Sequence, residues 1–155
     1  MSPGDARPGA LPGPDRRTFV QGLLGVLAAL AVSPRAAAAG DPPPPDAAPI
    51  LTPETRASLA AGQVRDYRKQ GDLFLLADAG GIYALTSICT HRGCSVRWSG
   101  EGFTCPCHGS EYDRLGAVTH GPARLPLRHL AVQEVEPGGP LRVDPAVTVP
   151  PGTRL

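Results

Sequence analysis

The chain has 155 residues, with 15 basic and 14 acidic side chains and a formal net charge of +1. From Gly40 onward there are 12 acidic and 11 basic side chains, and no stretch gathers Lys and Arg into a stripe. This distribution excludes nucleic acid as a partner, because nucleic-acid-binding domains carry a basic face. The last two thirds of the chain are long enough for one small domain with a single core.

An apolar run near the N-terminus follows a pair of arginines. The stretch DRRTFV (15–20) leads into an almost uncharged segment that ends at Val32 and is followed by small residues. These features are typical of an export signal, and the paired arginines resemble the twin-arginine type. As a helix, residues 19–32 would span roughly 21 Å, short of the ~30 Å hydrocarbon core. We predict that residues 1–39 are a signal that is either cleaved or retained as an anchor, with any membrane association through residues 18–39.

A proline-rich stretch separates this segment from the domain. Residues 40–53 contain four consecutive prolines, a composition that favours extended polyproline II structure and a semi-rigid spacer. We therefore predict a linker over 40–53 and a folded domain over 54–155. The stretch TPETRASLAAGQV (52–64) is expected to begin with a helical turn capped by Thr52.

Short apolar runs separated by turn residues fill the rest of the domain. Residues 72–78 and 82–88 are two such runs joined by Gly80-Gly81, which predicts a β-hairpin. Apolar positions alternate only partly over 127–136, which indicates a β-bulge or a bend. Further short runs lie at 95–98, 102–105 and 140–143. Strands at this spacing, with Gly and Pro turns between them, indicate a small antiparallel all-β domain.

All four cysteines lie in two short loops, CTHRGC (89–94) and CPCHGS (105–110), together with two of the four histidines. Each loop carries a short metal-binding signature, Cys-x-His in the first and Cys-x-x-His in the second. Three chemistries compete for these residues: two disulfides, a Cys2His2 zinc site, and a [2Fe–2S] cluster with cysteines on one iron and histidines on the other. Disulfides leave both histidines unexplained, and a zinc site leaves two cysteines over.

Both loops closely resemble those of the Rieske iron–sulfur family, and the resemblance extends to Pro106, Gly109 and Ser110 in the second loop. It covers roughly residues 72–135. The resemblance implies a small antiparallel Rieske-type domain in which each loop donates one cysteine and one histidine to one [2Fe–2S] cluster. The implied iron ligands are Cys89, His91, Cys105 and His108.

The resemblance also implies roles for the residues around the ligands. A second cysteine pair is a mark of the disulfide-containing members, which include the cytochrome bc1 and b6f subunits and the small subunits of arsenite oxidase. It implies a disulfide between Cys94 and Cys107. Ser110 would donate a hydrogen bond to a cluster sulfide, and Tyr112 to the sulfur of a ligand cysteine. The GPA stretch (121–123) would form a proline loop that covers the cluster.

Histidine ligands make such a cluster a strong electron acceptor. Two ferric ions, two sulfides and two thiolates sum to zero charge, so an added electron meets less repulsion than in a four-thiolate cluster. Hydrogen bonds to sulfur raise the reduction potential further. The imidazole nitrogens that do not bind iron are predicted to accept a proton when the cluster takes an electron. His91 and His108 would thus couple electron and proton transfer, as oxidation of a quinol requires.

The resemblance favours the iron–sulfur subunit of a quinol:cytochrome c reductase-like complex, on the periplasmic side of the bacterial cytoplasmic membrane. A cytochrome of b or c type would then be its redox partner. Arg92 departs from this pattern, because the bc-complex family usually has an apolar residue at the tip of the first loop. Desolvating a guanidinium against cytochrome b is costly. The alternative is a periplasmic Rieske electron carrier, or the small subunit of an arsenite oxidase-like molybdenum oxidoreductase.

Overall fold

The computed structural model describes residues 47–155. The predicted signal or anchor and the first residues of the predicted linker lie outside this range. No helix within 47–155 is both long enough and apolar enough to cross a membrane. The elements are β1 (Ile50–Thr55), β2 (Val64–Asp66), α1 (Arg68–Gly71), β3 (Leu73–Asp78), β4 (Gly81–Thr86), β5 (Arg97–Trp98), β6 (Phe103–Thr104), β7 (Glu111–Tyr112), β8 (Val118–His120), β9 (His129–Glu134) and β10 (Pro140–Val149).

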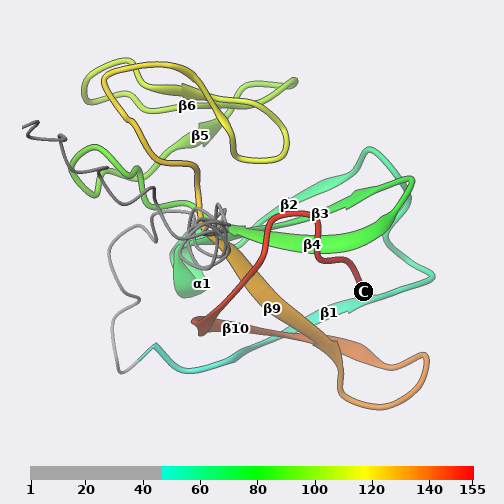
Figure 1. Cartoon of the computed structure of the whole chain (residues 1–155). Helices are drawn as coiled ribbons and strands as arrows, with labels where there is room; N and C mark the ends of the chain where they lie inside the picture. The colour runs from blue at the N-terminus through cyan, green and yellow to red at the C-terminus, as the bar shows by residue number, and fades with distance from the viewer. Residues whose placement is uncertain (1–46) are drawn as a thin grey trace, which may run out of the picture. The chain divides into compact units, whose positions relative to one another are not determined.

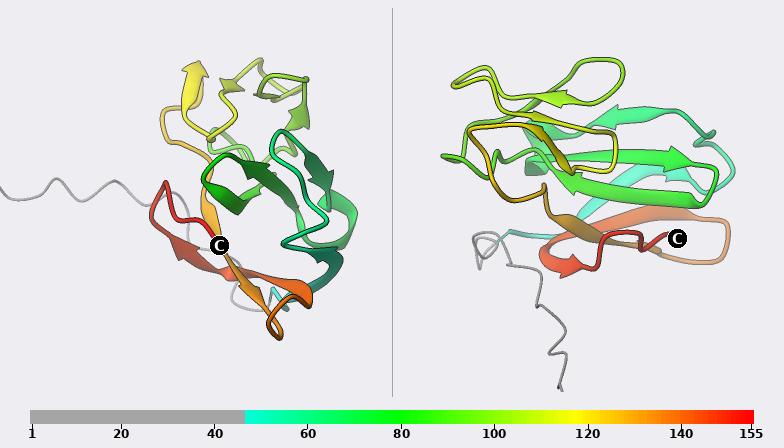
Figure 2. Two further views of the ribbon diagram at one scale, coloured as in Figure 1. Left: turned by 90° about the vertical axis from the view of Figure 1, so that its right-hand side faces the viewer. Right: turned by 45° about the horizontal axis from the view of Figure 1, so that its top comes forward.

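The strands form two antiparallel sheets. A six-stranded sheet has the order β1-β10-β9-β4-β3-β2, and a four-stranded sheet has the order β5-β6-β7-β8. The small sheet lies at one end of the large one, and the large sheet curves strongly around its own core (Figures 1 and 2). The predicted all-β antiparallel fold is therefore confirmed, with α1 as a single short helical turn within the described residues.

The hairpin predicted over residues 72–88 is present as β3 and β4, with its turn one residue earlier than expected. Asp78 pairs with Gly81, so Ala79 and Gly80 form the turn. Gly81 has φ 131°, and a Cβ atom there would lie 2.5 Å from the carbonyl oxygen of Leu155. A glycine is therefore needed at this position to begin β4, because the C-terminal residue packs against its backbone.

The prediction of a helical turn beginning at Thr52 is wrong. Thr52 lies buried in β1, where its hydroxyl donates a hydrogen bond to the carbonyl of Leu141 in β10. Pairing with β10 places this segment at the edge of the sheet. Pro53 is tolerated there because an edge strand loses no ladder hydrogen bond on its open side. The expected irregularity near β9 is present, but the extra residues belong to β10, between Asp144 and Thr148.

Strand β3 is buried on both faces, which explains its continuous apolar sequence LFLLAD. Its even-numbered side chains, such as Phe74, face the small sheet, and its odd-numbered ones, such as Leu75, face the interior of the large sheet. Phe103 of β6 packs between two aromatic rings, with ring centroids 4.9 Å from Phe74 and 5.1 Å from Trp98. The core that joins the two sheets also contains both free cysteines of the two loops.

Replacing Phe103 with alanine should therefore loosen the junction between the sheets. We expect Phe103→Ala to lower the free energy of unfolding by about 3–5 kcal/mol, because it leaves a cavity in a closely packed core. Leu51→Ala is the control, since Leu51 is 64% exposed, and its effect should stay within about 0.5 kcal/mol. Urea unfolding followed by circular dichroism measures both values. Equal effects of the two substitutions would contradict this account of the core.

Candidate metal centre

The loops 89–94 and 105–110 have the same backbone construction. In each, the N–H of the first residue donates to the carbonyl of the sixth, at 2.7 and 2.8 Å. The N–H of the fifth residue donates to the carbonyl of the first, at 2.8 and 3.0 Å. That fifth residue is Gly93 in one loop and Gly109 in the other, with φ 73° and 75°, a conformation that glycine adopts without strain. The loops are therefore alike in backbone, although their cysteine-to-histidine spacing differs by one residue.

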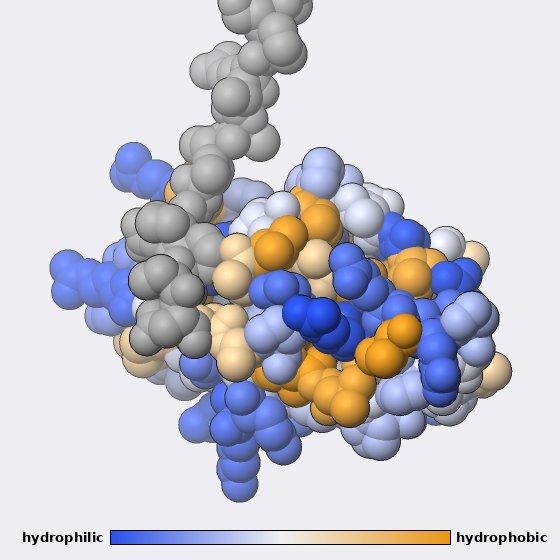
Figure 3. Space-filling view, turned by 90° about the horizontal axis from the view of Figure 1, so that it is seen from below, coloured by the Kyte–Doolittle hydropathy of each residue, from blue (hydrophilic) through white to orange (hydrophobic). Residues whose placement is uncertain are grey.

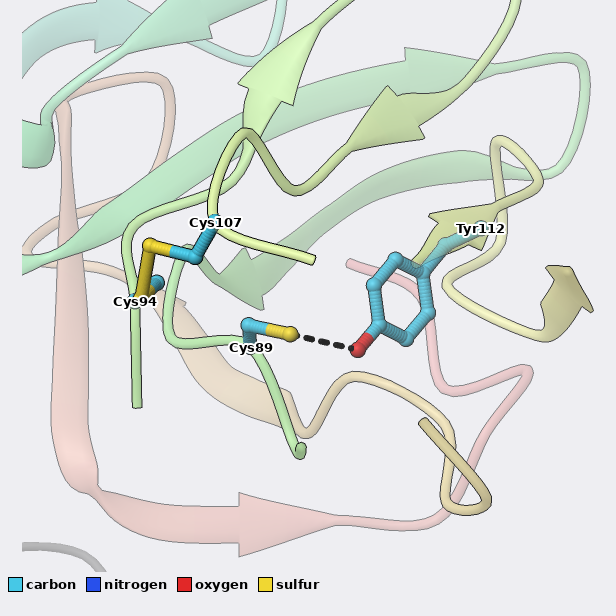
Figure 4. Close-up of a disulfide and its surroundings, with 4 residues drawn as sticks. All are labelled: Cys89, Cys94, Cys107 and Tyr112. Carbon is cyan, nitrogen blue, oxygen red and sulfur yellow. Dashed lines mark hydrogen bonds between the residues drawn. A yellow bond between two sulfur atoms is a disulfide. The ribbon is translucent and has the colours of Figure 1, made fainter. Parts of the chain in front are cut away.

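A disulfide joins the two loops. Cys94 and Cys107 are bonded, as expected (Figure 4), while Cys89 and Cys105 are free and buried. The alternative of two disulfides is therefore wrong. The sulfur of Cys105 and both disulfide sulfurs all lie within 4.8 Å of one another. This trio is no metal site, since two of its sulfurs are bonded to each other; it shows that the disulfide lies beside a free thiol.

The two free thiols shift each other's pKa, and their surroundings act on them differently. Burial raises the pKa of Cys89, but hydrogen bonds from the Tyr112 hydroxyl and the backbone of His91 outweigh it, so the net pKa is lowered. Burial raises the pKa of Cys105, and the neighbouring Cys89 adds to the rise. The backbone N–H groups of the second loop oppose this only in part. Cys89 is thus the thiol better prepared to act as a thiolate ligand.

The two loop histidines lie side by side at the surface. Their ring centroids are 4.8 Å apart and their planes are almost perpendicular, at 89°. His108 is exposed and His91 half-buried, with the Nδ1 atom of His91 buried and without a hydrogen-bond partner. Burial and the charges of His108 and Arg92 lower the pKa of His91, which favours its neutral form. A neutral imidazole with an unpartnered buried nitrogen is suited to bind a metal.

Tyr112 reaches the first loop from β7. Its hydroxyl lies 3.2 Å from the sulfur of Cys89, so the expected contact with a cysteine sulfur is present (Figure 4). Burial and the hydrogen bond with Cys89 raise the pKa of Tyr112 to about 12, which keeps the phenol protonated and able to donate. The same oxygen accepts the N–H of Thr90 at 3.2 Å and lies 3.1 Å from its hydroxyl.

The segment 121–126 is hydrogen-bonded to both loops. The N–H of Ala123 donates to the hydroxyl oxygen of the fully buried Ser110 at 3.0 Å. The hydroxyl of Thr90 donates to the carbonyl of Leu125 at 2.6 Å. The predicted proline loop is therefore held against both cysteine loops. The sequence pattern did not single out Thr90; its only signal is a hydroxyl residue between a cysteine and a histidine.

The donor set brought together here fits an iron–sulfur cluster. Two free thiols are buried in the same core cluster, and a buried imidazole nitrogen without a partner belongs to the histidine pair. Thiolate and imidazole are the ligands of clusters with mixed coordination, and the same types also suit zinc. The two loops thus offer ligand types that suit either metal group, and comparison with known proteins distinguishes between the two groups.

Iron–sulfur subunits of cytochrome b6-f complexes are similar to this chain. Subunit 2 from the cyanelle of Cyanophora paradoxa is 53% identical over 58 residues, which cover 36% of this chain and 24% of that protein. The subunit of Cyanothece is 52% identical over 58 residues, covering 35% and 32% of the two chains. The matched part of this chain thus spans about a third or less of the length of these relatives.

Solved structures include the cyanobacterial plasma membrane Rieske protein from Synechocystis, which is 36% identical with a TM-score of 0.41. That alignment covers 46% of this chain and 75% of the other. The family model of the Rieske [2Fe-2S] domain matches residues 54–136, more than half of the sequence. Members of this family bind a [2Fe–2S] cluster, which is therefore the cofactor of this domain. The chain belongs to the Rieske [2Fe-2S] family.

Proposed function

We propose that Cys89 and Cys105 bind one iron of the cluster and that His91 and His108 bind the other. The burial of both free thiols in one core cluster and the 4.8 Å separation of the two rings support this assignment. The unpartnered Nδ1 of His91 is the nitrogen that would bind iron. The disulfide and the segment 121–126 then hold the two ligand loops at a fixed separation.

The function supported best is electron transfer by the iron–sulfur subunit of a quinol:cytochrome c reductase-like complex. When bound, a cluster with two histidine ligands takes up and releases one electron at a higher potential than a four-cysteine cluster. The single observation that carries the proposal is the pair of matched loops, which place free thiols and adjacent imidazoles beside a disulfide. The relatives named as cytochrome b6-f subunits support a membrane-linked redox complex as the partner.

Neighbouring side chains adjust the charge on the ligands. The Tyr112 hydroxyl donates toward the Cys89 sulfur, and the Ser110 hydroxyl also helps to lower the pKa of that cysteine. Both hydroxyls would draw charge from sulfur and so favour the reduced state. The ring nitrogens of His91 and His108 that do not bind iron would take up a proton with the electron and release it to solvent.

A second candidate is a Rieske carrier or the small subunit of a molybdenum oxidoreductase, without quinol chemistry. The exposed Arg92 between Cys89 and Cys94 favours it, because a guanidinium is poorly suited to a dry contact with a membrane cytochrome. In either case we place the domain outside the cytoplasmic membrane, since a structural disulfide persists in oxidising compartments. Residues 1–39 would serve as signal or anchor, and the linker predicted over 40–53 would end before Ile50, where β1 begins.

Reduction by a mild donor tests the proposed function. Ascorbate should reduce the holoprotein and produce the rhombic electron paramagnetic resonance signal of a cluster with histidine ligands, because such clusters have potentials up to about +300 mV. A zinc-containing protein would give no signal under any reductant. A signal that appears only with dithionite would contradict a high-potential centre and, with it, the proposed quinol donor.

Removing the Tyr112 hydroxyl should lower the reduction potential. We expect Tyr112→Phe to shift it downward by roughly 40–60 mV, the equivalent of a hydrogen bond of about 1–1.5 kcal/mol in a one-electron couple. The matched control is Tyr83→Phe, because the hydroxyl of Tyr83 is also buried but donates to the carbonyl of Arg114. A redox titration measures both variants. The same shift in each would show that the contact with Cys89 has no special role.

The reduction potential should also depend on pH. Reduction adds negative charge beside His91 and His108 and raises the pKa of their free ring nitrogens, so between the two pKa values each electron is accompanied by a proton. Raising the pH therefore disfavours reduction, with a limiting slope of about −59 mV per pH unit for one proton. Titrations from about pH 6 to about pH 10 measure this slope. A flat profile would remove the proton-coupled role of both histidines.

A further inference from the structure

We propose that the surface around the paired histidines docks an acidic face of a protein redox partner through the guanidinium groups of Arg92 and Arg124. This inference rests on the proposed electron-transfer function and names the chemistry of the partner. Both arginines are exposed. They belong to two segments that meet at the candidate metal centre, so a partner attracted to them arrives beside His91 and His108.

The backbone on either side fixes the position of Arg124. Its predecessor Ala123 donates its N–H to Ser110 in the second cysteine loop, and its successor Leu125 accepts the hydroxyl of Thr90 in the first. Arg124 therefore stands between two anchor points, one on each ligand loop. Its position next to the site is set by hydrogen bonds to two buried or half-buried side chains, rather than by the mobility of a free loop.

Arg92 lies even closer to the site, because it directly follows His91. It is exposed, so its guanidinium faces solvent beside that histidine. Gly93 follows in the left-handed conformation and carries the chain back toward Cys94 and the disulfide. Arg92 thus occupies the outer part of the first loop.

Neither arginine has an acidic partner among residues 47–155. Four other arginines of this region form salt bridges with carboxylates: Arg56, Arg65, Arg68 and Arg154. Arg114 is held by the carbonyl of Gly62 and stacks on Trp98. The two ligand loops and the segment 121–126 contain no Asp or Glu at all. The charges of Arg92 and Arg124 are therefore not neutralised within the domain.

The acidic residues of the small sheet gather elsewhere. Glu101, Glu111 and Asp113 line one hollow of the surface together with Thr104 and Thr119. Asp113 is also occupied, because it accepts the backbone N–H groups of Leu115 and Ala117. These carboxylates therefore lie outside the two ligand loops and the segment 121–126.

The same surface has no large hydrophobic side chain exposed to solvent. Within residues 47–155 the exposed large hydrophobic side chains are Leu51, Leu115, Val135 and Val147, all outside the two loops and the segment 121–126. Hydrophobic residues do reach the surface on the face opposite the small sheet, interspersed with hydrophilic ones (Figure 3). A contact at the histidines therefore gains little from large hydrophobic side chains, which leaves charge complementarity as the main source of its specificity.

An acidic protein suits this surface better than an anionic membrane. Recognition of acidic lipids typically needs clusters of about 4–8 basic residues, whereas two arginines stand here. Two unpaired guanidiniums are enough to steer an acidic protein and to orient it, because rim charges act mainly on the association rate. The attraction is long-ranged at low ionic strength and is screened within about 8 Å at physiological salt.

The test uses one electron acceptor in two forms that differ in the sign of their surface charge. The probes are a lysine-rich cytochrome c and the same cytochrome after succinylation of its lysines, which makes its surface acidic. Stopped-flow absorbance measures the oxidation rate of the reduced full-length holoprotein. Surface plasmon resonance measures binding with both proteins oxidised, when no electron is transferred. The variants are the double substitution Arg92→Gln with Arg124→Gln and, as matched control, Arg142→Gln, an exposed arginine of β10.

We expect wild-type protein to react faster with the succinylated cytochrome as the salt concentration falls. The double variant should lose roughly tenfold in this rate at low salt and almost nothing at high salt, whereas Arg142→Gln should stay within about twofold of wild type. Binding of the oxidised proteins should follow the same order. A double variant equal to wild type would overturn the proposal, as would a preference for the lysine-rich form.

Two further measurements separate the possible causes of failure. Vesicles of phosphatidylglycerol that bind in an Arg92- and Arg124-dependent way, while the succinylated cytochrome does not, would overturn the protein partner in favour of a membrane. The ascorbate-reduced resonance spectrum is recorded for every variant. If wild-type protein lacks that spectrum, the proposed function fails; if the spectrum is present and the charge preference is absent, only the docking proposal fails.

Discussion

Burial of two unpaired thiols in the core between the sheets is the constraint on which the rest of the site depends. Cys89 and Cys105 belong to the same buried cluster as Phe74 and Phe103, so each ligand loop begins from a residue fixed by packing. The loops can separate only if that core opens. The disulfide cross-links the loops beside the thiol of Cys105, and the segment 121–126 is bonded to both loops. Packing thus positions the cysteines, and covalent and hydrogen bonds restrain the histidines beyond them.

Polar groups next to the thiols are arranged so that one proton is directed at sulfur. Thr90 donates its hydroxyl proton to a backbone carbonyl, so its oxygen can only accept from Tyr112. The phenolic proton of Tyr112 therefore has two acceptors, the Thr90 oxygen and the Cys89 sulfur, and a thiolate is the stronger one. The backbone of Tyr112 packs closely against Gly102, because a Cβ atom at Gly102 would collide with the Tyr112 carbonyl.

Local patterns predicted the elements whose cause is local. The strands β3 and β4 were recognisable because burial on both faces produces continuous apolar runs. The two cysteine loops were recognisable because ligand residues recur at short, fixed spacings. The site residues followed from spacing and resemblance. The strand β1 was missed because pairing with β10, about 90 residues away, overrides the local signal of Thr52. Thr90 and the anchors around Arg124 were missed for the same reason, since their partners lie in other loops.

The two histidines are unequally exposed, so a partner approaching this surface meets His108 first. His108 is open to solvent, whereas His91 is half-buried and carries the unpartnered Nδ1. Electron transfer requires a close approach, but a partner that buried the whole surface would have to desolvate two unpaired guanidiniums. A hydrated contact avoids that cost, because Arg92 and Arg124 keep their water while the edge of His108 is covered. A hydrated contact also leaves the free ring nitrogens next to solvent, where a proton can leave. In the docking we propose, the exposed arginines and the solvent-facing histidine both fit a short contact that keeps its water.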